Sequence, residues 1–166
     1  MVDCATRDHR DFEAVFVRHF SGLVRALTVV CGDRETAADC VQEAFARAHE
    51  RWDRLEGYED PVGWIRHVAI NLARDAHRRS RRGQLAHERL AASEGARVSH
   101  DQPTDPLTAE LAHLSPRQRA ALALRYVEGL SVAEIANALG ISQGAVKFHL
   151  HAGRERLRPL VNPREQ

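Results

Sequence analysis

Residues 131–150, SVAEIANALGISQGAVKFHL, decide the fold of the second half of the chain, because they contain two helix starts and one tight turn. Ser131 followed three residues later by Glu134 is a capping box, which predicts a helix start. Gly140 supplies the positive φ that a turn between two helices needs, and Ser142 caps the second helix. Two short helices joined in this way form a helix-turn-helix. The side chains expected to face inward are apolar: Ile135, Ala136, Leu139, Ile141, Val146 and Leu150.

The second helix of this unit, about residues 143–157, is expected to enter the major groove of DNA with its N-terminal half. Glutamine pairs with adenine, lysine with guanine, and an apolar ring can meet a thymine methyl group. Arg154 and Arg158 suit phosphate contacts. A solvated polar helix face, with the phenylalanine folded back onto the core, is the alternative interpretation. The side chains expected to point outward are Gln143, Lys147, Phe148 and His151.

Helices are also predicted along the rest of the chain. Apolar residues at helical spacing indicate a first helix over residues 11–30, and Asp60-Pro61 starts a third that is expected to run into the arginines at 78–82. Ser115-Pro-Arg-Gln118 marks another helix start. Residues 83–107 are interpreted mainly as a linker, with a short helix over residues 85–92 as the alternative. The second helix carries an apolar stripe of Ala38, Val41, Phe45, Ala48 and Trp52, and the third is expected to bury Ile65, Val68 and Leu72.

The net charge of +1 hides a strong division along the chain. Residues 1–62 carry −5, residues 63–83 carry +5, residues 84–106 carry −2 and residues 107–166 carry +3. Five arginines within nine residues repel one another unless an anionic partner is present. One side of the third helix therefore suits single-stranded nucleic acid, since an aromatic, two polar groups and arginines follow helical spacing there. These residues are Trp64, His67, Asn71, Arg74 and Arg78.

This surface has a second interpretation, in which Trp64 belongs to the core and the arginines form a solvated helix end. Core packing is favoured for Trp64, and nucleic-acid binding for the arginines.

Composition and missing motifs exclude several classes of protein. The 166 residues are 43% hydrophobic and 28% charged, which predicts a soluble globular chain. The sequence has no run of about 18 consecutive apolar residues, which a membrane span would need. Its charged N-terminus is unlike a signal peptide. The three cysteines fit a reduced cytoplasm, and Cys31 and Cys40 match no zinc-ligand spacing. Since no nucleotide-binding or nucleophile motif is present, we expect no metal, no cofactor and no enzymatic activity.

Several stretches together resemble the sigma-70 family of transcription initiation factors, in its compact extracytoplasmic-function (ECF) form. Residues 38–45, ADCVQEAF, resemble the family's polymerase-binding helix, and residues 61–79 resemble its promoter-melting helix. Residues 114–119, LSPRQR, and the helix-turn-helix segments up to Lys147 resemble its C-terminal DNA-reading domain. Two motif sets in the family's order are more specific than either one alone.

The resemblance implies an all-α protein with two small domains. An N-terminal helical bundle, residues 11–82, would bind core polymerase and recognise and melt the −10 element. A helix-turn-helix domain, residues 108–162, would read the −35 element. The linker would span residues 83–107, and the tails residues 1–10 and 163–166.

It also implies partners and site residues. Core RNA polymerase would be bound through the clamp helices of its largest subunit and the flap of its second-largest subunit. Promoter DNA and an anti-sigma factor are the other implied partners, in the cytoplasm and without membrane insertion. The implied polymerase-binding residues are Asp39, Gln42, Glu43 and Arg47. Those implied for the −10 element and melting are Trp64, His67, Asn71, Arg74, Arg78 and Arg79. Those implied for the −35 element are Ser142, Gln143, Lys147, Phe148, His151 and Arg154.

The chain departs from the family at three positions that, by the resemblance, would face DNA. The family usually carries serine where this chain has Phe148, and arginine where it has His149 and Ala152. The −35 sequence therefore cannot be inherited from better-known members.

The alternative function is a stand-alone helix-turn-helix regulator of the response-regulator type. That class would place an α/β domain or a ligand-binding sheet in front, whereas residues 11–82 are predicted to be helical throughout. An interaction adaptor without DNA contact would leave the arginines unexplained.

Overall fold

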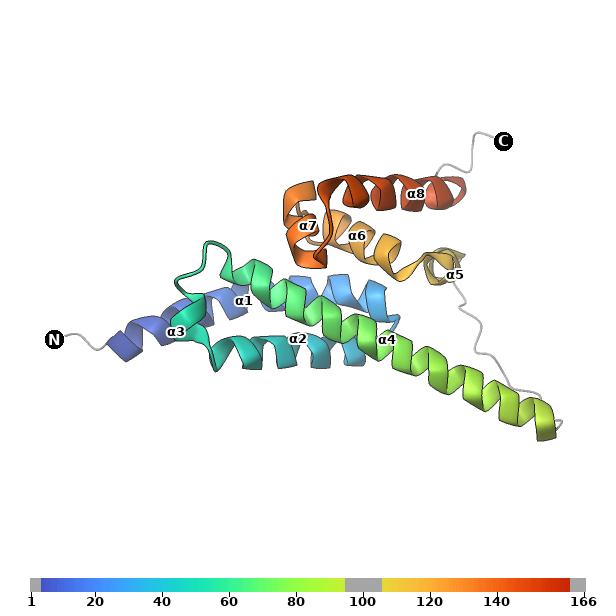
Figure 1. Ribbon diagram of the computed structural model, residues 1–166, viewed down its shortest axis with the longest axis horizontal. Helices are drawn as coiled ribbons and strands as arrows, with labels where there is room; N and C mark the ends of the chain where they lie inside the picture. Colours follow the sequence, from blue (N-terminus) through green and yellow to red (C-terminus); the bar gives the residue numbers. More distant parts are fainter. Residues whose placement is uncertain (1–3, 95–105, 162–166) are drawn as a thin grey trace.

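The computed structural model describes residues 4–94 and 106–161, and within these ranges it contains helices and no strand (Figure 1). The N-terminal part forms α1 (Cys4–Cys31), α2 (Arg34–His49), α3 (Trp52–Leu55) and α4 (Pro61–Glu94). The C-terminal part forms α5 (Pro106–His113), α6 (Pro116–Tyr126), α7 (Val132–Leu139) and α8 (Gln143–Val161). The prediction of an all-α protein is confirmed.

The predicted helix starts are confirmed by their hydrogen bonds. Asp60 Oδ1 accepts from the Gly63 amide at 2.7 Å, and α4 begins at the next residue, Pro61. Ser115 and Ser131 both form complete capping boxes, with Gln118 and Glu134 as their third helical residues. Gly140 ends α7 with a φ of 63°, the left-handed conformation that the turn requires. The helix-turn-helix is therefore fixed by local chemistry.

The apolar face of α4 differs from the one predicted. Ile65 is buried as expected, but Val68 and Leu72 are only partly buried, and the fully buried positions include Ala69, Ile70 and Ala73. The reason is that α4 packs against α1 and α2 as well as against α7. A helix with neighbours on two sides buries a wider face than a single stripe predicts.

Two helix ends also differ from the prediction. α1 begins at Cys4, within the segment predicted as an N-terminal tail. α4 continues through residues 83–94, which the sequence predicts as part of a linker. These residues are mostly leucine, alanine, glutamine, glutamate and arginine, which favour a helix and outweigh the single Gly83, at a cost of about 1 kcal/mol.

The stretch Phe12–Cys31 of α1 is long and apolar enough to cross a membrane by length and composition, with a mean hydropathy of 1.5. In this structure its apolar side chains serve another purpose. Leu23, Leu27 and Val30 are buried against the other helices, and Phe16 packs edge-on to Phe45 of α2. The segment is the central core helix of the bundle.

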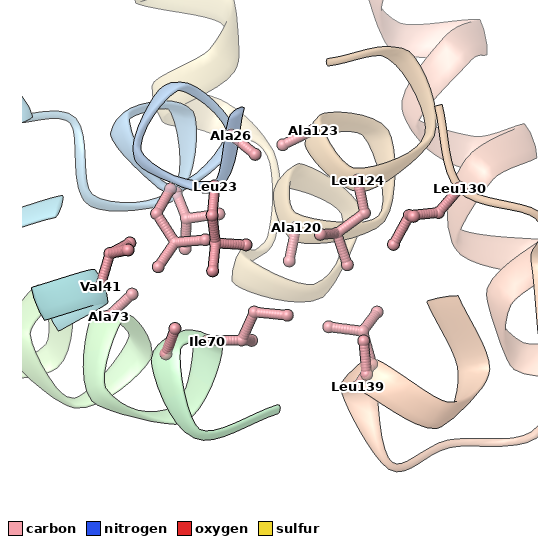
Figure 2. Close-up of a cluster of buried hydrophobic side chains, with 14 of the residues drawn as sticks. Leu23, Ala26, Val41, Ile70, Ala73, Ala120, Ala123, Leu124, Leu130 and Leu139 are labelled. Atoms are coloured by element: carbon pink, nitrogen blue, oxygen red, sulfur yellow. The ribbon is translucent and has the colours of Figure 1, made fainter. Parts of the chain in front are cut away.

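The two halves of the molecule pack against each other. We expected two domains placed independently on a tether, but α6 lies on α1 and α7 lies on α4, and one hydrophobic cluster runs through both halves (Figure 2). Alanines at this junction allow the helices to approach closely, which the pattern of each half alone does not reveal. The junction includes Leu23, Ala26, Ile70, Ala120, Ala123, Leu124 and Leu139.

We predict that the folded protein loses stability as the pH falls below about 6.5. Burial lowers the pKa of His77 and of His149 below the ordinary value of 6.5, and nearby arginines lower them further. His77 Nε2 and His149 Nδ1 are buried without a hydrogen-bond partner, so the folded state favours both neutral rings. The unfolded chain therefore binds more protons below pH 6.5, and the free energy of unfolding falls there.

Urea unfolding at pH 7.5 and pH 5.5 measures this loss. The His77→Gln, His149→Gln double variant should show a smaller difference between the two midpoints. This comparison separates the histidines from carboxyl groups such as Glu128, whose pKa burial raises. An equal difference in both proteins would contradict the prediction.

Candidate nucleic-acid interface

The outer face of α8 presents the side chains that the sequence predicts to read duplex DNA. Val146 and Leu150 are buried, which turns the opposite side of the helix toward solvent. Phe148 is 66% exposed, so its ring is not folded back onto the core. The outward orientation predicted for the side chains on this face is confirmed, and their contacts with DNA stay a prediction. The exposed side chains are Ser142, Gln143, Lys147, Phe148, His151 and Arg154.

Two features hold α8 in place. Ser142 Oγ accepts a hydrogen bond from the Ala145 amide at 3.1 Å, so Ser142 also caps the helix. Gly153 is buried against α6, where an added Cβ would lie 2.7 Å from Leu122 Cδ1. The glycine lets the recognition helix lie close to α6, a role that no turn or cap pattern in the sequence indicated.

His67 and Asn71 form a hydrogen-bonded pair on α4. His67 Nε2 lies 3.0 Å from Asn71 Nδ2, and His67 Nδ1 lies 3.0 Å from the carbonyl oxygen of Ala138 in α7. A carbonyl only accepts, so Nδ1 carries the proton and Nε2 accepts from the Asn71 amide. The structure thus brings the two residues together but joins His67 to the helix-turn-helix.

Trp64 is half-buried and packs against the core, which agrees with the interpretation favoured for it. Its remaining surface lines a groove of about 320 Å³ between α4 and α2, together with Val68, Glu43 and Arg47. Trp64 therefore borders the acidic face of α2.

The arginines of α4 lie C-terminal to this groove, over residues 74–82. Arg74 is half-buried, whereas Arg78, Arg79, Arg81 and Arg82 are exposed. Arg78 pairs with Asp75 on the same helix, and this hydrogen bond lowers the pKa of the Asp75 carboxyl. Because one carboxylate faces several guanidinium groups, the stripe keeps the net positive charge that phosphate binding needs.

The polar face of α2 is exposed as predicted. Asp39, Gln42, Glu43 and Arg47 all lie on the side opposite the buried Val41 and Phe45, and Glu43 pairs with Arg47 at 2.7 Å. In Figure 1, α2 and the helix-turn-helix lie on opposite sides of α1 and α4. This face is therefore free for a protein partner while α8 is free for DNA.

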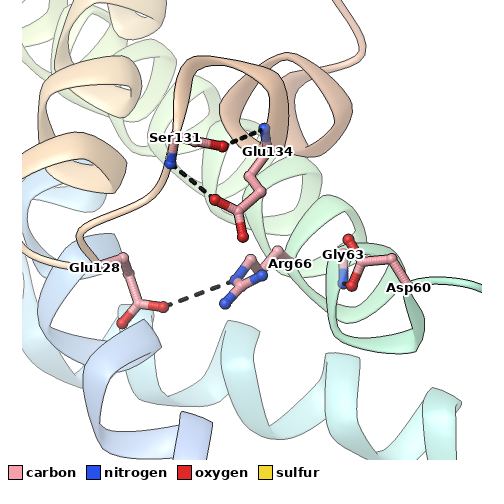
Figure 3. A network of polar contacts seen from close by, with 6 residues as sticks. All are labelled: Asp60, Gly63, Arg66, Glu128, Ser131 and Glu134. Carbon is pink, nitrogen blue, oxygen red and sulfur yellow. Dashed lines mark hydrogen bonds and ion pairs between the residues drawn. The ribbon is translucent and has the colours of Figure 1, made fainter.

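Two buried arginines escaped the sequence analysis. Arg119 is 5% exposed and donates to the carbonyl oxygens of Leu114, at 3.2 Å, and Val30, at 3.4 Å. Arg66 forms an ion pair with Glu128 across the junction of the two halves (Figure 3). Arg119 and Val30 are 89 positions apart, so no local pattern could have indicated the contact.

The described residues contain no group of three or more histidine, cysteine, aspartate or glutamate side chains that could hold a metal ion. Burial raises the pKa of the Cys31 thiol to about 12, which leaves it a poor nucleophile at neutral pH.

Comparisons with known proteins agree with this arrangement. Residues 15–83 match the family model for sigma-70 region 2, and residues 104–157 match that for sigma-70 region 4. The RNA polymerase sigma-E factor of Streptomyces coelicolor is 31% identical over 93% of this chain and 88% of its own length. The sigma factor CarQ of Myxococcus xanthus is 32% identical over 93% of this chain and 91% of its own.

A solved structure shares the fold. The sigma factor RpoE of Bartonella quintana, in complex with the anti-sigma factor NepR, superposes with a TM-score of 0.66 at 19% identity, over 95% of this chain and 99% of that one.

A two-domain helical protein with an exposed recognition helix and an arginine-lined helix is, as a class, a DNA-binding transcription factor. This chain belongs to the sigma-70 family, as an RNA polymerase sigma factor of the ECF type. Members of the family are non-enzymatic transcription initiation factors, and those of the ECF type are soluble.

Proposed function

We propose that this protein joins core bacterial RNA polymerase and directs promoter-specific initiation by reading the −35 element with α8 and the −10 element with α4. One observation carries this proposal: two segments match sigma-70 regions 2 and 4, in that order, and each carries the predicted DNA-binding side chains along one helix. The proposed domains are residues 11–82 and 108–162, joined by residues 83–107.

Each DNA surface has its own task in this proposal. Gln143, Lys147, Phe148 and His151 read base edges of the −35 duplex, and Ser142 and Arg154 assist at its backbone. At the −10 element, His67, Asn71 and residues 55–63, which run from the end of α3 into the first turn of α4, surround a base flipped from the non-template strand. Trp64 borders this site, and Arg74, Arg78 and Arg79 hold nearby phosphates.

The polymerase is contacted at two places. The exposed face of α2 docks on the clamp helices through Asp39, Gln42, Glu43 and Arg47. The flap binds the helix-turn-helix domain.

These partners place the protein in the cytoplasm, where promoter DNA and polymerase are found, with no membrane insertion, no cofactor and no enzymatic activity of its own. An anti-sigma factor is a further proposed partner, since the Bartonella quintana relative was solved bound to one.

Charge reversal on α2, Asp39→Arg with Glu43→Arg, is expected to weaken binding to core polymerase roughly ten-fold or more, because like charges replace complementary ones at the contact. Both side chains are exposed, so the helix content measured by circular dichroism should not change. Glu13→Lys, an exposed charge reversal on α1, is the matched control and should bind as the wild type does. Unchanged affinity in the double variant would remove the docking role of this face.

Run-off transcription with core polymerase of the same organism tests the whole proposal. We expect specific transcripts only when the protein and the core enzyme are both present. Tight sequence-specific binding of the free protein to promoter duplex in a gel shift, without stimulation of transcription, would instead support a stand-alone regulator.

A further inference from the structure

A cavity of about 590 Å³ lies beside the C-terminal end of α1 and is also lined by residues of α4, α5 and α6. Its volume falls within the range of about 300–1,000 Å³ that small-molecule sites occupy. None of the side chains proposed for promoter or polymerase binding lines it, so the proposed function does not account for it. Its lining includes the polar and charged side chains of Asp33, His77, Ser80, Arg81, Gln84 and Arg119.

Arg119 brings a buried positive charge to this cavity without a counter-ion. Its guanidinium donates only to the backbone carbonyl oxygens of Leu114 and Val30, and its Nε atom is buried without a hydrogen-bond partner. Within residues 4–94 and 106–161, no ion pair includes Arg119. A buried charge is costly unless an opposite charge is close to it. An anion in the cavity would supply the partner that the chain itself does not.

Two further basic groups, Arg81 and His77 of α4, line the same cavity. Burial lowers the pKa of His77, and Arg119 and Arg81 lower it further, while a hydrogen bond with the backbone of Cys31 acts the other way. Burial also lowers the pKa of Arg119, and Arg81 adds to this effect. The three groups therefore lie close enough to disfavour one another's positive charge. An anion placed among them would reverse this repulsion.

Asp33 is the one carboxylate among the residues that line the cavity, and it already has a partner. Its Oδ2 accepts from the Thr36 amide at 2.7 Å and so caps the N-terminus of α2. The positive end of that helix balances part of its charge. Because Asp33 is exposed whereas Arg119 is buried, the interior of the cavity stays basic.

A phosphate group suits this set of side chains better than a carboxylate does. A phosphate ester carries between one and two negative charges at pH 7 and has three strong acceptor oxygens. It can therefore pair with both arginines and still accept from the Ser80 hydroxyl and the Gln84 amide, which are neutral donors on α4. One water occupies about 30 Å³, so the cavity also has room for an organic part. Its apolar lining residues include Val29, Leu111 and Ala112.

We propose that this cavity is a binding site for a small molecule that carries a phosphate group, with Arg81 and Arg119 as the cations that hold the phosphate. The negative charge beside His77 also favours its protonated ring, so binding is coupled to the uptake of a proton. Since no promoter or polymerase contact takes part, the site goes beyond the proposed function and does not depend on it.

NMR titration of the full chain tests this site through the Cε1 proton of His77, whose signal is identified by its loss in His77→Gln. The probes are ribose 5-phosphate, inorganic phosphate and ribose. Both phosphates should raise the pKa of His77 by about one pH unit at saturation, whereas ribose should leave it unchanged. Tighter binding of ribose 5-phosphate would identify a phosphate ester as the ligand, and equal affinities would identify free phosphate. The readout needs no polymerase, so its result is independent of run-off transcription.

Two variants and a matched control assign the binding to the cavity. Arg119→Gln removes the buried charge and should abolish phosphate binding, with circular dichroism to check that the helices persist. Arg81→Gln covers the case in which they do not, because Arg81 is exposed, and it should weaken binding roughly ten-fold. Arg82→Gln, the exposed neighbour that does not line the cavity, should bind as the wild type does. An unchanged His77 pKa at millimolar phosphate, or an equal loss in Arg82→Gln, would overturn the site.

Discussion

Replacing Lys147 or His151 with alanine is expected to relax the choice of base at one or two positions of the −35 element, with each removed side chain costing roughly 1–3 kcal/mol of discrimination. Both side chains are exposed in the first half of the recognition helix, next to the buried Val146 and Leu150. Alanine is the strongest helix former, so the helix itself should persist. Transcription from a library of −35 sequences, with core polymerase, measures the effect.

The matched control is Arg156→Ala, which removes an exposed charge from α8 outside the proposed contacts. It should leave the base preferences unchanged. If the Lys147 and His151 variants were equally impaired on every sequence, the two side chains would be phosphate contacts or structural groups, and the assignment of base readout would be wrong.

The Arg78→Ala, Arg79→Ala double variant is expected to behave in the opposite way and weaken open-complex formation on every promoter. Phosphate contacts carry no direct sequence information, so the ranking of promoters should stay as in the wild type. The slope of log affinity against log salt should become shallower by about 0.7 to 0.9 for each arginine that binds a phosphate. Filter binding of the holoenzyme at salt concentrations from about 50 to about 200 mM gives this slope.

Asp75 offers the control for this pair, since it is the carboxylate that holds Arg78. Asp75→Asn frees the guanidinium without removing it and should not make the slope shallower. An unchanged slope in the double-alanine variant would mean that the two arginines form a solvated surface of the helix and bind no phosphate.

Local chemistry explains how much of the fold the sequence could predict. The capping boxes at Ser115 and Ser131 and the left-handed Gly140 act within three or four residues, so a short stretch of sequence contains the whole cause. The outward face of α8 follows from the same spacing, because burying Val146 and Leu150 leaves one side for Lys147.

What could not be predicted depends on contacts between distant segments. The sequence pattern of α4 predicts one buried side, but α7 covers a second, and Ile70, which lies near Leu139 of α7, is buried as well (Figure 2). Glu128, which pairs with Arg66, and Val30, one of the two partners of Arg119, each lie in the other half of the molecule from the arginine. Each arginine therefore looks like an ordinary surface residue in the sequence. For the same reason the sequence indicated two tethered domains and missed their packing.

The unbroken run of α4 to Glu94 has a mechanical consequence. From Asn71 to Glu94 a helix rising 1.5 Å per residue extends about 35 Å. The chain therefore leaves α4 about 35 Å from the proposed −10 site. Part of the span between the two promoter elements is then supplied by fixed geometry and costs no chain entropy. Each residue of a helix also adds a rotation of about 100° about the helix axis. Deleting one residue between residues 83 and 94 would therefore rotate the direction in which the chain leaves α4 by about 100°, while shortening the helix by only about 1.5 Å. The placement of the second domain thus depends more on the rotation of this segment about the helix axis than on its length.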